Sequence, residues 1–81
     1  MKATIHITLK NGVLDTQGKA IENALSQLGF QGVDEVRQGK LVEVNLSESD
    51  PAKAEAALTD ICEKLLANTV IENYHIHLDS E

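Results

Sequence analysis

The stretch Ala3-Thr4-Ile5-His6-Ile7-Thr8-Leu9 alternates apolar and polar side chains without a break. A period of two residues is typical of a β-strand that buries one face and leaves the other to water or to a partner. Asn11-Gly12 then interrupts the pattern as a turn signal. The fold therefore starts from a half-buried strand over residues 3–9.

The next pattern predicts a helix from Asp15 to about Leu28, because a carboxylate before the first turn can cap free backbone amides. Gly29 follows as a stop signal, since glycine adopts the left-handed conformation cheaply. The apolar residues of this helix recur at helical spacing and form one stripe: Ala20, Ile21, Ala24, Leu25 and Leu28.

Two strands are predicted next, over residues 33–38 and 41–46, joined as a hairpin by a turn at Gly39-Lys40. In the second of them Val42, Val44 and Leu46 share one side, and Glu43 and Asn45 share the other.

Ser49-Asp50-Pro51 opens a second helix that ends near Ala67-Asn68. Its expected buried stripe is Ala54, Ala57, Leu58, Ile61, Cys62 and Leu65. A last strand over residues 70–78 places Tyr74, Ile76 and Leu78 opposite His75 and His77.

This order of elements predicts an α+β fold, a ferredoxin-like βαββαβ sandwich that forms a single domain over residues 1–81. Its four-stranded antiparallel sheet would carry both helices on one face. The first and third strands would be central, with the fourth beside the first. The second and fourth strands would be exposed edges, which favours pairing between copies, and we expect a homodimer.

Seven Lys/Arg against thirteen Asp/Glu give a formal net charge of −6. Nucleic-acid binding relies on clustered cations, so we expect no nucleic-acid partner. No run of residues is apolar enough for a membrane span, and the first residues do not resemble a signal peptide. We expect a soluble, cytoplasmic protein without a membrane partner.

A catalytic centre is not visible in the sequence, which lacks a phosphate-binding glycine loop, a Cys-x-x-Cys pair and a nucleophile elbow. Cys62 is better interpreted as a buried small hydrophobe than as a nucleophile. His6, His75 and His77 would share the open face of the sheet and are candidate zinc ligands. The favoured interpretation is that they are polar residues on a wet or partner-covered face.

Several segments, taken in order, resemble the PurS family, the small subunit of phosphoribosylformylglycinamidine (FGAM) synthase. They are residues 14–21 and 24–30, the segment Val36-Arg37-x-Gly39-Lys40, and residues 62–74 with Leu-Leu-Ala-Asn at their centre. The sequence departs from the family where Thr16 and Thr69 replace a common proline, which puts local stiffness in doubt.

The resemblance implies a non-catalytic subunit of purine biosynthesis that bridges a large synthetase subunit, PurL, and a glutaminase subunit, PurQ, and supports ammonia transfer between them. ATP, Mg²⁺ and glutamine would be used by the complex, and this chain would bind no cofactor. Candidate partner-surface residues are Asp15, Arg37, Gly39, Lys40 and Asn68, although Asp15, Gly39 and Asn68 would equally serve as caps and turns. The alternative functions are a small regulatory dimer that binds a ligand or a metal, and an independent enzyme.

Overall fold

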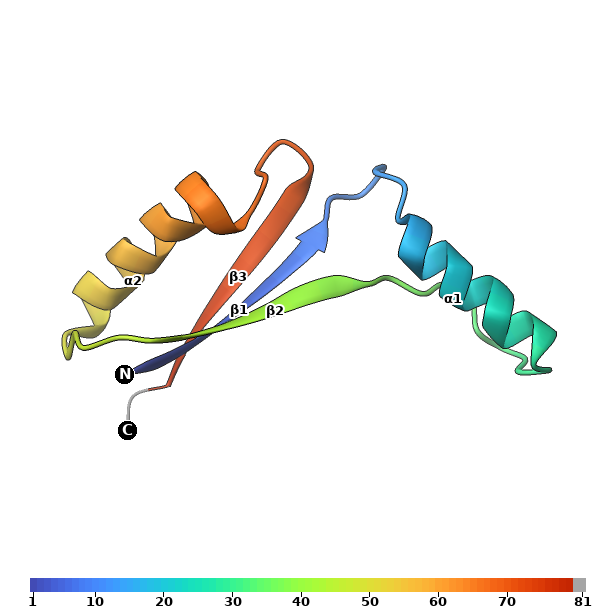
Figure 1. Cartoon of the computed structure of the whole chain (residues 1–81), viewed down its shortest axis with the longest axis horizontal. Helices are drawn as coiled ribbons and strands as arrows, with labels where there is room; N and C mark the ends of the chain where they lie inside the picture. The colour runs from blue at the N-terminus through green and yellow to red at the C-terminus, as the bar shows by residue number, and fades with distance from the viewer. Residues whose placement is uncertain (80–81) are drawn as a thin grey trace.

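A computed structural model, which describes residues 1–79, contains a three-stranded antiparallel sheet in the order β2-β1-β3 (Figure 1). Strand β1 (Lys2–Leu9) lies between β2 (Gly39–Asn45) and β3 (Glu72–Asp79). The last predicted strand is therefore beside the first, as expected. The α+β class is confirmed, but the described residues form three strands and not four.

The alternation in β1 produces the expected two faces. Ala3, Ile5 and Ile7 are at most 1% exposed and form the centre of the core. On the opposite, open face, His6 lies between Leu41 of β2 and His75 of β3. Burial of one face of β1 between two neighbours is what its period of two predicts.

Helix α2 (Pro51–Ile61) continues into a wider π-helical turn, η1 (Cys62–Leu66). Its N-cap is Asp50, whose carboxylate accepts a hydrogen bond from the Ala52 amide at 3.0 Å. Leu58 and Cys62 are fully buried on the core face of the sheet. The predicted stripe was too wide, because Ala57 and Leu65 are exposed: a single helix on a narrow sheet covers it with only one row of residues.

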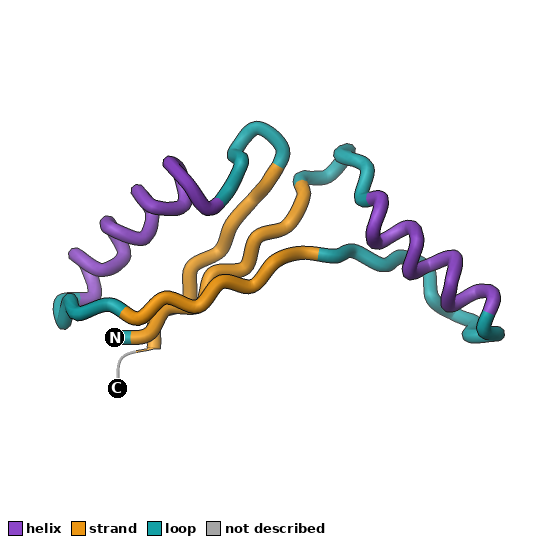
Figure 2. The backbone as a smooth tube through the Cα atoms, viewed as in Figure 1, coloured by secondary structure: helices purple, strands orange, loops and turns teal. Residues whose placement is uncertain are grey.

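Helix α1 (Thr16–Gln27) begins at the predicted N-cap, Asp15, and ends before Gly29, which has a φ of 91°. Its predicted position was wrong. Figures 1 and 2 show α1 beyond the end of the sheet, whereas α2 lies alongside it. The apolar stripe of α1 consequently remains accessible, with Ile21 39% and Leu28 73% exposed.

The predicted strand over residues 33–38 and the turn at Gly39-Lys40 are also absent. Gly39 is already part of β2, where it pairs with Thr8 of β1. Residues 33–38 lead into β2 as an unpaired segment (Figure 2). The hairpin prediction failed because β1 pairs with the chain from Gly39 onward, at the point where a reversal was expected.

The molecule is elongated and thin, with principal extents of 49 × 29 × 14 Å and a radius of gyration of 16.1 Å. A compact domain of this length has a radius of gyration of about 12 Å. In the part of the chain that the structure describes, no helix has the length and apolar character needed to span a bilayer.

Candidate partner-binding site

The site lies at the junction between the sheet and the first turn of α1, and Asp15 is its central residue. One carboxylate oxygen accepts a hydrogen bond from the Gly18 amide at 2.8 Å, and the other accepts one from the Gln38 amide at 2.7 Å. Asp15 thus caps α1 and also joins it to the segment that leads into β2. These two hydrogen bonds hold the pKa of the Asp15 carboxyl below its usual value, and the bond from Gln38 has the larger effect.

Gly18 permits this close approach of two backbone segments. A Cβ atom at this position would collide with the carbonyl oxygen of Val36 and with the Asp15 carboxylate. Any larger residue would therefore push the first turn of α1 away from the returning chain.

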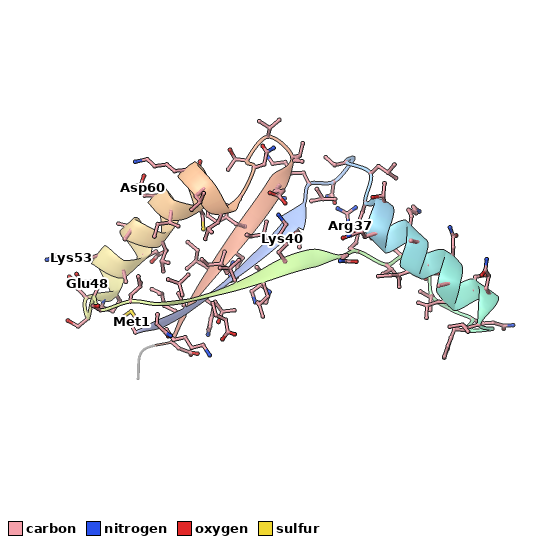
Figure 3. The ribbon with its side chains drawn as sticks, viewed as in Figure 1. Met1, Arg37, Lys40, Glu48, Lys53 and Asp60 are labelled. Atoms are coloured by element: carbon pink, nitrogen blue, oxygen red, sulfur yellow. The ribbon has the colours of Figure 1, made fainter. Side chains whose placement is uncertain are left out.

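Arg37 closes the same junction from the side of β1. Its guanidinium donates a hydrogen bond to the carbonyl oxygen of Leu9 at 2.8 Å. Figure 3 shows Arg37 between the start of β2 and the first turn of α1. Together, Asp15 and Arg37 connect both ends of the segment that carries α1, so the helix is held in a defined direction.

A hollow of about 250 Å³ lies at this junction and includes Asp15, Gly39 and Lys40 in its lining. The Lys40 ammonium lies 3.6 Å from the carboxylate of Glu72, at the start of β3. The structure thus brings three of the five predicted partner-surface residues to one hollow, with Arg37 beside it. Whether they contact a partner stays a prediction.

Asn68 lies outside this hollow, in the turn before β3. Its side-chain oxygen accepts a hydrogen bond from the backbone amide of Val70 at 3.2 Å. Its backbone amide donates a hydrogen bond to the carboxylate of Glu72 at 2.7 Å. Glu72 therefore connects the Asn68 turn to Lys40. Sequence analysis missed Glu72, although an acidic residue on the apolar side of a strand was the available signal.

The three histidines do share the open face, as predicted. His6 pairs directly with His75, and His77 pairs with Thr4. Across residues 1–79, however, no three His, Cys, Asp or Glu side chains are grouped as metal ligands, so the zinc-site candidate finds no support in this geometry.

Cys62 is buried, and burial raises the pKa of its thiol, with the charge of Glu63 acting in the same direction. A thiol with a raised pKa is a poor nucleophile, which agrees with its interpretation as a core residue. Beside it, the Tyr74 hydroxyl donates a hydrogen bond to Glu63 at 2.6 Å, and this bond raises the pKa of Tyr74 to about 12.

Comparison with known proteins decides the family. The family model described as PurS, phosphoribosylformylglycinamidine (FGAM) synthase, matches residues 2–80. This chain belongs to the PurS family. The chain is 50% identical over 70 residues to the PurS subunit of Synechocystis, covering 86% of this chain and 70% of that protein. It is 44% identical over 80 residues to the PurS subunit of Mycobacterium leprae, covering 99% and 98%.

Solved PurS structures have the same fold. PurS of Methanocaldococcus jannaschii, a subunit of formylglycinamide ribonucleotide amidotransferase, superposes with a TM-score of 0.90 at 40% identity, covering 99% of this chain and 96% of that one. A chain in the PurLQS structure from Thermotoga maritima superposes with a TM-score of 0.85 at 30% identity, covering 94% and 93%. The extended position of α1 is thus compatible with the PurS fold over nearly the whole chain.

Proposed function

We propose that this chain is the small subunit of an FGAM synthase in purine biosynthesis, where it bridges a PurL-type synthetase and a PurQ-type glutaminase. The observation that carries the proposal is the match over nearly the full length to PurS chains, including one in a PurLQS structure. ATP, Mg²⁺ and glutamine are then bound by the other subunits.

The physical role of such a bridge follows from the chemistry of ammonia. Ammonia that escapes into water at neutral pH becomes protonated and loses its nucleophilic lone pair. A small subunit that holds the two active sites together keeps transfer intramolecular, which raises the effective concentration of the nucleophile. The junction around Asp15 and Arg37 gives this chain the rigid shape that a bridge requires.

We also propose that the chain functions as a homodimer, on the ground of its surface. The accessible surface is 5907 Å². A compact monomer of 8.8 kDa exposes about 4,800 Å². The excess of about 1,100 Å² exceeds the roughly 800 Å² that each partner buries in a standard interface.

The test is reconstitution with the synthetase and glutaminase subunits of the same organism. Glutamine-dependent amidine formation is measured with and without this chain, and ammonium-dependent formation is measured as the control. We expect the chain to be required for the glutamine reaction only. Equal glutamine-dependent rates in its absence, without co-elution with either subunit, would refute the bridging function.

A further inference from the structure

The open face of the sheet carries a feature that the bridging function does not use, a pair of histidines on neighbouring strands. His6 of the central strand β1 lies directly opposite His75 of β3, and both side chains are exposed. The neighbour of His6 on β2 is Leu41, which has no ligating atom in its side chain. Two imidazoles therefore stand side by side on an accessible surface.

The spacing of this pair suits the chelation of one metal ion. Residues directly opposite each other in an antiparallel pair have Cβ atoms about 4.5–5.5 Å apart, and strand side chains stand roughly perpendicular to the sheet. A metal ion binds an imidazole nitrogen at about 2.0–2.1 Å, so two nitrogens bound at a right angle lie about 3 Å apart. Inclining the two rings toward each other closes this difference without a change in the backbone.

His77 shares the strand and the face of His75 but not its position. It lies opposite Thr4, and its Nε2 is 3.5 Å from the carboxylate of Asp79. Two residues along a strand are about 6.6 Å apart, which is wider than the cross-strand spacing. This separation agrees with the absence of a group of three ligands within residues 1–79. A closed zinc site is therefore not formed, whereas a site of two imidazoles with water in the remaining positions is available.

The electrostatic surroundings of the pair do not oppose a divalent cation. Lys2, at the start of β1, has its ammonium 2.6 Å from the carboxylate of Glu43, so its charge is compensated. The chain as a whole has a formal net charge of −6, which attracts cations. The nearest described neighbours of the pair on the open face include no lysine or arginine: they are Thr4, Thr8, Leu41, Asn73 and His77.

We propose that His6 and His75 form a surface site for one late first-row divalent ion, such as Ni²⁺ or Cu²⁺. Imidazole is a preferred ligand of these ions, and their affinity for a given site increases toward Cu²⁺ along the row. An ion held by both rings joins β1 to β3. Because the two histidines are brought together only by the fold, the ion stabilises the folded chain. The site is separate from the junction around Asp15 and does not depend on the bridging function.

The first experiment measures Ni²⁺ binding by isothermal titration calorimetry, with protein that carries no histidine tag. We expect one Ni²⁺ per chain in wild type. His6→Gln and His75→Gln should each weaken binding at least about 10-fold, since the second ligand of a linked pair binds at high effective concentration. His77→Gln is the matched control on the same strand and face, and it should change the dissociation constant by less than about 2-fold.

The second experiment measures thermal unfolding by circular dichroism, which also verifies that each variant is folded. At a Ni²⁺ concentration 100 times the dissociation constant, we expect the midpoint to rise by about 10 °C in wild type and in His77→Gln. His75→Gln should show no rise under the same conditions.

Three results would overturn the proposal. The first is wild-type protein that binds no stoichiometric Ni²⁺, and the second is binding that survives His6→Gln or His75→Gln. The third is an equal loss of binding in His77→Gln, which would place the site along β3 and not across the two strands. Neither experiment uses amidine formation, so failure here is separate from failure of the bridging function.

Discussion

At the scale of single residues, the junction between the sheet and α1 depends on one carboxylate, which both caps α1 and binds the segment before β2. Asp15 is only 8% exposed and accepts hydrogen bonds from two backbone amides, that of the nearby Gly18 and that of Gln38, which is distant in sequence. Sequence reasoning identified the cap because capping is local. It could not identify the bond to Gln38, because no spacing rule connects residues 15 and 38.

Asp15 gives the fold a pH dependence of predictable sign. Its pKa is lower in the folded chain than the unfolded value of 3.8, so its contribution is complete above that value and is lost as the pH falls through the lowered folded pKa. We expect Asp15→Asn to unfold more readily than wild type at pH 7, and the difference to shrink below pH 3.8. Urea unfolding at several pH values measures this, and a difference that is constant with pH would contradict it.

Tyr74 provides a second titration, and its phenolate absorbance is assigned directly because the chain has one tyrosine. Its pKa is raised to about 12 by the hydrogen bond to Glu63, so this contribution to stability is complete below the unfolded value of 10.0 and is lost as the pH rises toward 12. We expect phenolate absorbance to appear with a midpoint near 12 in wild type and closer to 10 in Glu63→Ala. Circular dichroism on the same samples verifies that the chain is folded, and equal midpoints in two folded proteins would contradict the assignment.

At the scale of elements, the two helices have different supports. Helix α2 is stabilised by the core of its own chain, through residues such as Leu58 that contact the sheet face. Helix α1 has a good cap and a good stop signal, but within residues 1–79 Ile21 and Leu28 of its apolar stripe remain exposed. Most helix stability in proteins comes from packing of the apolar face, so α1 requires a cover that α2 already has.

This difference predicts contrasting effects of leucine truncation on α2 and η1. Leu58→Ala removes a side chain with no exposed surface and should lower the free energy of unfolding by about 2–5 kcal/mol. Leu65→Ala, at a side chain that is 78% exposed, should change it by no more than about 0.5 kcal/mol. Chemical unfolding followed by circular dichroism compares the two, and equal costs would show that the core is assigned wrongly.

At the scale of the whole molecule, the exposed apolar surface concentrates on residues 10–38. Leu14, Phe30 and Val33 are 68%, 60% and 45% exposed, in addition to the α1 stripe. An apolar surface of this extent on a 14 Å thin molecule is typical of a subunit interface and unusual for a free monomer. This exposed apolar surface supports the proposed homodimer, in which a second copy would cover it.

Ile21→Glu tests this conclusion against Asn23→Glu, which adds the same charge on the opposite side of α1. Losing the burial of one isoleucine costs about 2 kcal/mol. We therefore expect the dissociation constant of the dimer to be at least about 30-fold larger for Ile21→Glu than for wild type. Asn23→Glu should leave the dimer unchanged. Sedimentation equilibrium measures both constants, and equal constants would exclude the α1 stripe from the interface.

The sequence by itself determined the elements that depend on local order. The period of two in residues 3–9, the caps at Asp15 and Asp50 and the stop at Gly29 each act within a few residues, and each was predictable. The resemblance to PurS could also be recognised from the sequence, because it rests on motifs along the chain.

Only the tertiary structure decided where α1 lies and which strands are paired. The pattern of residues 33–46 predicts two strands joined by a turn, but alternation alone does not decide which strand each of them pairs with. In the structure residues 39–45 pair with β1, and residues 33–38 form no strand. The physical reason for the outcome is the ladder with β1, which includes Gly39, together with the hydrogen bonds of Asp15 and Arg37 that hold residues 10–38 beyond the end of the sheet.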